Sequence, residues 1–207
     1  ALFSNTTGLN NVAVGYQSLY TNTIGTNNTA VGWAALTNSS TGTRNTAVGS
    51  QAMTSNTTGT YNTAFGDRAL LTNSTGNNNT AIGESALYSN TANNNTAVGW
   101  NALQANTTGT PNDAFGYDAL YSNTTGFGNV GIGYQALYAN TTGVTNTAVG
   151  YAALYANTTG TDNTAVGYNA GSSQTTAAYN AIFGRYAGAS ITTGGANTII
   201  GANAGFS

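Results

Sequence analysis

The sequence predicts an all-β fold, a single β-solenoid of about twelve 17-residue coils. Three observations support this prediction. One glycine recurs at a fixed interval, a strand-forming phrase such as Asn45–Gly49 ends on each copy of it, and apolar residues stand at constant distances from it. A fixed period of about 20 residues is typical of solenoids, whose repeats bury their apolar faces only against neighbouring repeats.

We call the recurring glycine the corner glycine and number the positions of each coil from it. The spacing between copies is seventeen, except between Gly83 and Gly99, where it is sixteen. The twelve copies are Gly15, Gly32, Gly49, Gly66, Gly83, Gly99, Gly116, Gly133, Gly150, Gly167, Gly184 and Gly201.

Two apolar columns predict the core. Position −1 holds Val, Ile or Phe in every coil, as at Val31, Val48 and Val149. Position +4 holds Leu or Met in the first nine coils, as at Leu36, Leu87 and Leu137. Residues of the first kind favour strands, so we expect a strand before each corner glycine. Each buried side chain contributes about 1.5–3 kcal/mol. The segment after the corner glycine fits a second strand or one helical turn equally well.

Asparagine occupies position −4 in every coil, which predicts a ladder of stacked amides joined by hydrogen bonds along the solenoid axis. Members of this column are Asn28, Asn45, Asn62, Asn79, Asn146 and Asn163. A second glycine follows a polar run in most coils, as at Gly42 and Gly143, and we expect it to turn the chain with a positive φ. We interpret the Asn-x-Thr sequons in these runs as turn residues, because they accept glycans only in a eukaryotic secretory route.

The unbroken repeat predicts one domain spanning residues 1–207, with a variant sub-segment at 168–207. In that sub-segment the Leu column is replaced by Gly171, Gly188 and Gly205, so the core must narrow or be refilled. The chain starts at Ala1 and finishes at Ser207 in mid-coil, and we therefore expect polymerisation or continuation in a longer polypeptide.

Charge and composition argue against several functions. Three arginines and five acidic residues give a net charge of −2 and no basic patch, which disfavours nucleic acid and anionic membrane surfaces as partners. No apolar run approaches the length of a membrane-spanning helix, so we expect no membrane insertion.

We expect no enzyme, catalytic residue, cofactor or metal. Histidine and cysteine are absent, which excludes the usual triads and thiol nucleophiles and removes the best zinc ligands. Asp67 and Glu84 occupy the same position on adjacent coils, at a separation near that of a glycosidase pair. Arg68 lies beside both, so we interpret the three as a surface charge cluster.

Two aromatic columns are candidate interface or ligand surfaces. Position +1 holds Tyr16, Trp33, Trp100, Tyr117, Tyr134, Tyr151 and Tyr168, and position +5 holds Tyr20, Tyr88, Tyr121, Tyr138 and Tyr155. Such rings stack on one another, join chains or fibres, or bind carbohydrate. The Thr column at position −3 suggests ice binding as a remote alternative, although the Thr-x-Thr pair usual in ice-binding solenoids is absent.

The stretches Asn95–Gly109, Asn129–Gly143 and Asn146–Gly160 resemble repeats of phage tail-fibre-like proteins and, with shorter units, the head repeats of trimeric autotransporter adhesins. The adhesin resemblance implies a left-handed β-roll of three chains whose surface binds host or matrix molecules. The 17-residue unit is longer than is typical of that family.

These observations predict a stiff, protease-resistant building block of an extracellular fibre, on a cell surface or a virion. The expected partner is the chain itself, as a homotrimer or a head-to-tail filament. The alternative function is an adhesin that uses the Tyr and Trp columns to bind surface glycans.

Overall fold

A computed structural model describes residues 1–205 and confirms an all-β solenoid of 17-residue coils. Each coil contributes one short strand, and the described part of the chain contains no helix. The coils fall into two compact units, Ala1–Asn101 and a second that begins at Ala102, and the single domain expected from the sequence stays a prediction.

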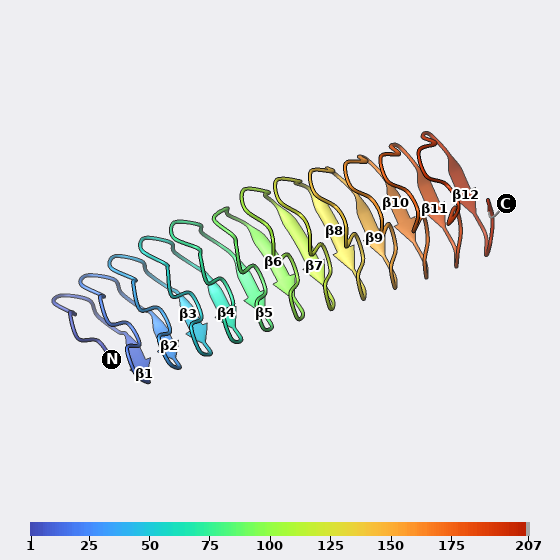
Figure 1. The fold of residues 1–207 in the computed structure, drawn as a ribbon. Helices are drawn as coiled ribbons and strands as arrows, with labels where there is room; N and C mark the ends of the chain where they lie inside the picture. The colour runs from blue at the N-terminus through green and yellow to red at the C-terminus, as the bar shows by residue number, and fades with distance from the viewer. Residues whose placement is uncertain (206–207) are drawn as a thin grey trace. The chain divides into compact units, whose positions relative to one another are not determined.

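All strands are parallel to their neighbours and follow one another in chain order within each unit (Figure 1). The first unit contains β1 (Val12–Val14), β2 (Thr29–Val31), β3 (Thr46–Val48), β4 (Thr63–Phe65), β5 (Thr80–Ile82) and β6 (Asn95–Val98). The second contains β7 (Asn112–Phe115), β8 (Asn129–Ile132), β9 (Thr147–Val149), β10 (Thr164–Val166), β11 (Ala181–Phe183) and β12 (Thr198–Ile200). Equivalent positions of successive coils lie opposite one another, as in the pair Val31 and Val48.

The rest of each coil is built from turns that are also bonded to the next coil. The amide of Leu36 donates to the carbonyl of Ala52 at 3.0 Å, and the amide of Asn38 donates to that of Thr54 at 3.1 Å. Positions +1 to +5 therefore form a turn, and neither the second strand nor the helical turn that fitted the sequence. Left-handed residues at +2 and +4, such as Gln135 (φ 53°) and Leu137 (φ 54°), bend this segment tightly.

The core consists of the Leu column and two columns of alanine. Fully buried members of the Leu column are Leu19, Leu36, Met53, Leu70, Leu87, Leu103, Leu120, Leu137 and Leu154. The alanines at −2 and +3, such as Ala47 and Ala52, are equally buried. Their small side chains leave room for one large apolar residue per coil, so the coil is thin.

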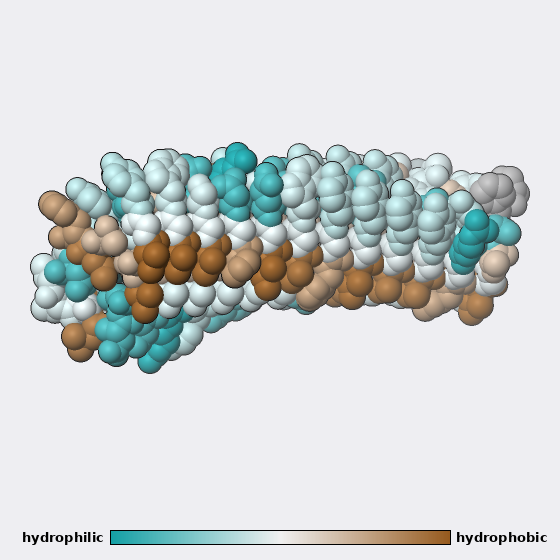
Figure 2. All heavy atoms as spheres, turned by 90° about the horizontal axis from the view of Figure 1, so that it is seen from below, coloured by the Kyte–Doolittle hydropathy of each residue, from teal (hydrophilic) through white to brown (hydrophobic). Residues whose placement is uncertain are grey.

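The prediction that the −1 column belongs to the core is wrong. Val31, Val48 and Val149 are only partly buried, and Phe65 is 57% exposed. Alternation along a strand sends only the middle residue inward, and that residue is the alanine. The Val, Ile and Phe side chains instead form an apolar band on the outer face of the sheet (Figure 2).

The −4 asparagines form the predicted ladder. Asn28, Asn45, Asn62, Asn79, Asn146 and Asn163 are fully buried. The side-chain oxygen of Asn28 accepts the backbone amide of Asn45 at 3.0 Å, while the Nδ2 of Asn45 donates to the carbonyl of Gly59 at 2.7 Å. Each side chain thus satisfies a backbone group of the next coil and a turn carbonyl inside the protein.

A second buried amide ladder at position +7 is not predicted by the sequence analysis. Its members include sequon residues: Nδ2 of Asn140 donates to Oδ1 of Asn123 at 2.8 Å, and Nδ2 of Asn157 donates to Oδ1 of Asn140 at 2.9 Å. These amides are enclosed in the fold, so glycans have no access to them in the folded protein.

The turn glycines are needed for space and not for a positive φ, so that prediction is also wrong. Gly143 does not have a left-handed φ. A Cβ there would lie 2.3 Å from Oδ1 of Asn140 and 2.5 Å from the carbonyl oxygen of Gly160. At Gly143 the buried amide and the next coil both approach the Cα and leave no room for a Cβ, whereas Ala92 and Ala177 hold the same position in two other coils.

In the variant sub-segment, the core space left by the missing Leu is filled by another side chain. Where Leu is lost at Gly171, the strand of the next coil carries Ile182 in place of the usual alanine, and Ile182 is fully buried. A Cβ on Gly171 would lie 3.0 Å from Cδ1 of Ile182. A large residue thus enters the core from the strand instead of from the turn.

The corner glycine is predicted to be irreplaceable, in contrast to a glycine two residues before it. A Cβ on Gly133 (φ 128°) would lie 2.5 Å from the carbonyl oxygen of Gly150. We expect Gly133→Ala to destabilise the fold by about 2–5 kcal/mol. A Cβ on Gly131 would lie 3.2 Å from the carbonyl oxygen of Ala136, a tight contact that the alanine-bearing coils accommodate. Gly131→Ala should therefore change the free energy of unfolding by less than about 1 kcal/mol. Chemical denaturation of both variants tests this contrast, and equal effects would contradict it.

The +7 ladder is predicted to be improvable where it is interrupted. Ser39 replaces asparagine, and both its hydroxyl and Oδ1 of Asn22 in the preceding coil are buried without a hydrogen-bond partner. Ser39→Asn supplies the missing amide and should raise the free energy of unfolding by about 1–3 kcal/mol. The reverse change in the intact part of the ladder, Asn140→Ser, is the matched control and should lower it. Thermal unfolding measures both, and a destabilised Ser39→Asn variant would refute this account.

Candidate functional site

Two ladders of stacked tyrosines in the second unit are the most organised surface feature. The first, which we call the +1 ladder, comprises Tyr117, Tyr134, Tyr151 and Tyr168, with ring centroids 4.9–5.0 Å apart and interplanar angles of 6–10°. The second, the +5 ladder, comprises Tyr121, Tyr138 and Tyr155, with centroids 5.1–5.3 Å apart and angles of 5–7°.

The coil register produces these stacks. The amide of Ala139 donates to the carbonyl of Tyr155 at 3.0 Å, which holds equivalent backbones at the usual separation of neighbouring strands, about 4.8 Å. This separation is close to the favourable distance between aromatic rings. In each coil that carries both tyrosines, the two are separated by a short turn whose residues, such as Ala153 and Leu154, are buried in the core. The two ladders therefore run along the two sides of this turn.

In the first unit the same columns do not form continuous ladders. Tyr16 and Trp33 are 68% and 50% exposed, and Ser50, Asp67 and Glu84 separate them from Trp100. The structure therefore brings together Tyr117, Tyr134 and Tyr151 among the predicted interface residues, but it leaves Tyr16 and Trp33 on coils well removed from Trp100.

The charge cluster of the first unit has the predicted geometry. Nε of Arg68 lies 2.8 Å from Oδ2 of Asp67, and a terminal nitrogen of Arg68 lies 3.6 Å from Oε1 of Glu84. All three side chains are 40–48% exposed, so solvent screens these pairs. The hydrogen bond and charge of Asp67 raise the pKa of Arg68, so its guanidinium stays protonated beside the two acids.

Three tyrosines of the two ladders have raised pKa values. Partial desolvation, followed by the charge of Asp118, raises the pKa of Tyr117 and of Tyr138. Tyr186, followed by desolvation, raises the pKa of Tyr168. The guanidinium of Arg185 lies 5.8 Å from the ring centroid of Tyr168 and 4.5 Å from that of Tyr186, at the end of the +1 ladder.

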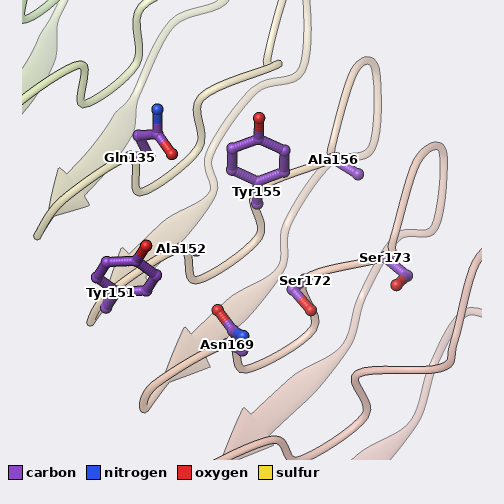
Figure 3. Close-up of a pocket in the computed structure, with 8 residues that line it drawn as sticks. All are labelled: Gln135, Tyr151, Ala152, Tyr155, Ala156, Asn169, Ser172 and Ser173. Atoms are coloured by element: carbon purple, nitrogen blue, oxygen red, sulfur yellow. The ribbon is translucent and has the colours of Figure 1, made fainter.

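A hollow of about 520 Å³ opens between the two ladders, at the point where the +5 ladder stops (Figure 3). The next coil carries Ser172 where a fourth tyrosine would stand, although its backbone stays in register: the amide of Ala156 donates to the carbonyl of Ser172 at 3.0 Å. The residues lining the hollow are Gln135, Tyr151, Ala152, Tyr155, Ala156, Asn169, Ser172 and Ser173.

The outer face of most strands carries Thr at −3, and every strand carries an apolar residue at −1, as at Thr46 and Val48. The side chains facing solvent are thus a Thr-x-Val pair and not a Thr-x-Thr pair. Ice binding stays a prediction.

Among residues 1–205, no group of three or more acidic residues is gathered as a metal site, and no helix is long and apolar enough to span a bilayer. Comparisons of the chain with protein-family models, with curated proteins and with solved structures find no match.

The stability of the fold is predicted to fall at alkaline pH. The folded-state pKa values of Tyr117 and Tyr138 are raised above the unfolded value of about 10. The contribution of these two phenols to the free energy of unfolding is therefore complete below that pH and is lost as the pH rises through the folded-state values. We expect the melting temperature to drop above about pH 10 and to drop less in Tyr117→Phe/Tyr138→Phe. Tyr179→Phe, which alters an exposed tyrosine outside both ladders, is the control. Equal pH profiles for the wild type and the double variant would refute this prediction.

Proposed function

We propose that this chain is a structural building block of an extracellular fibre, such as a surface appendage or the shaft of a phage tail fibre. The observation that carries the proposal is the repeated set of backbone hydrogen bonds that joins neighbouring coils on every side of the coil within each unit. Such an interface is extended by adding coils without any change in its chemistry. Length and stiffness are therefore the properties that this sequence provides most directly.

The turns support the same proposal, because loops are where proteases usually attack a folded chain. Here the amide of Thr57 donates to the carbonyl of Ser74 at 2.9 Å, and its hydroxyl donates to the same oxygen at 3.0 Å. A turn held in this way resists the local unfolding that cleavage requires. Lysine is absent and only three arginines are present, so trypsin-like enzymes also find few cleavage sites.

The exposed apolar band supports association of the chain with copies of itself. The outward band of Val, Ile and Phe, with Phe65 57% and Ile82 41% exposed, offers apolar surface for contact between copies. We propose assembly of the chain with itself, as a homotrimer or as a head-to-tail filament, outside the cell or on a virion. The resemblance of its repeats to tail-fibre and adhesin-head repeats favours the same setting.

The fibre proposal predicts resistance to proteinase K together with straight assemblies in negative-stain micrographs. Gly133→Ala is the matched control, because it disturbs the contact between coils while leaving the composition almost unchanged. We expect the wild-type chain to survive protease concentrations that degrade the variant. Digestion of both at the same rate, or only compact particles in the micrographs, would contradict a fibre role.

A further inference from the structure

We propose that the hollow beside Tyr155 is a binding site for a pyranose ring of a neutral oligosaccharide, a function beyond that of a structural shaft. The sugar ring occupies the position of the tyrosine that is missing from the +5 ladder. Ring stacking, a neutral polar lining and an open shape carry the inference, and all of them belong to the second unit.

The first argument is the uncovered face of Tyr155. One face of its ring stacks on Tyr138, with centroids 5.1 Å apart and planes inclined by 5°. The other face points to the coil in which Ser172 replaces tyrosine. Tyr155 is 36% exposed, and Tyr121 and Tyr138 are partly buried.

The second argument is the fit of the space. Because Ser172 stays in register and Ala189 holds the same position one coil further on, neither of these two coils places a ring against this face of Tyr155, and the hollow is open along the +5 column. A pyranose ring is nearly flat, and the C–H bonds on one of its faces can lie against an aromatic ring. The volume of about 520 Å³ falls within the usual range for ligand sites, about 300–1,000 Å³.

The third argument is the polar rim. Asn169 and Ser172 lie across the hollow from Tyr155, and Ser173 and Gln135 stand at its edges (Figure 3). Amides and hydroxyls both donate and accept hydrogen bonds, as the ring hydroxyls of a sugar require. No carboxylate or guanidinium is among the described residues that line the hollow, which favours a neutral ligand over an acidic sugar or a phosphate.

The shape of the hollow selects an oligosaccharide over a small enclosed ligand. The stacked rings of the +1 ladder, Tyr151 and Tyr168, continue along its far side and are 45% and 42% exposed. Further sugar residues can extend over these rings while one residue occupies the gap. The arrangement thus provides one specific subsite and an adjoining aromatic surface.

The test measures binding of cellotetraose, maltotetraose and chitotetraose by saturation-transfer difference NMR and calorimetry. The key variant is Ser172→Tyr, which extends the +5 ladder by one ring against Tyr155 and occupies the space proposed for the sugar. We expect the wild type to bind at least one of the three sugars and the variant to bind it about tenfold or more weakly. Asn169→Ala should weaken binding of the same sugar without lowering the melting temperature.

Two outcomes would overturn the site. One is that no sugar of the panel binds, or that p-cresol, a planar aromatic probe, binds in their place. The other is that Ser172→Tyr binds as tightly as the wild type, which would move any sugar contact elsewhere. Protease resistance and fibre formation are measured separately and should be unchanged in Ser172→Tyr, so failure of this proposal is distinguishable from failure of the fibre proposal.

Discussion

The structure depends on one constraint, the bonding of each coil to its copy one repeat further along the chain. Only three or four residues per coil form a strand, yet the turns are bonded to their neighbours as regularly as the strands are. Equivalent backbones are therefore held at a strand-like separation around the whole coil. The corner glycine follows from this constraint, since a Cβ on Gly150 would lie 2.5 Å from the carbonyl oxygen of Gly167.

A coil this thin cannot be filled by apolar residues alone, because its turns bring backbone polar groups inside. The two buried asparagine columns satisfy these groups, as when Nδ2 of Asn146 donates to the carbonyl of Gly160 at 2.8 Å. Buried polar groups are costly without partners. The few unpartnered buried side-chain atoms of the described chain lie in the +7 column, around Ser39, Asn73 and Gln174. Coils that follow the regular repeat thus give their buried polar groups hydrogen-bond partners, whereas coils that depart from it leave some of these groups unpaired.

The sequence predicted the period, the strand position, the Leu core and the −4 ladder, because each of these is a column of nearly constant residues. Val31, Val48 and Val149 face outward although they are apolar, because the alternation of a strand places the neighbouring alanine inside. The better signal was variation in size: an enclosed column accepts alanine in almost every coil, whereas a solvent-facing column accepts Val, Ile and Phe alike. The +7 ladder was missed because Asn-Thr-Thr is also ordinary turn chemistry.

The candidate site was beyond the reach of the sequence for a related reason. A column of tyrosines predicts a stack, but the hollow arises where the +5 tyrosines end, at Ser172 and then Ala189, beside +1 rings that continue. In a solenoid the register turns every such substitution into a local change of shape, because the coils above and below keep their places. Repetition gives this protein its scaffold, and a break in the repetition is the simplest way for it to acquire a specific site.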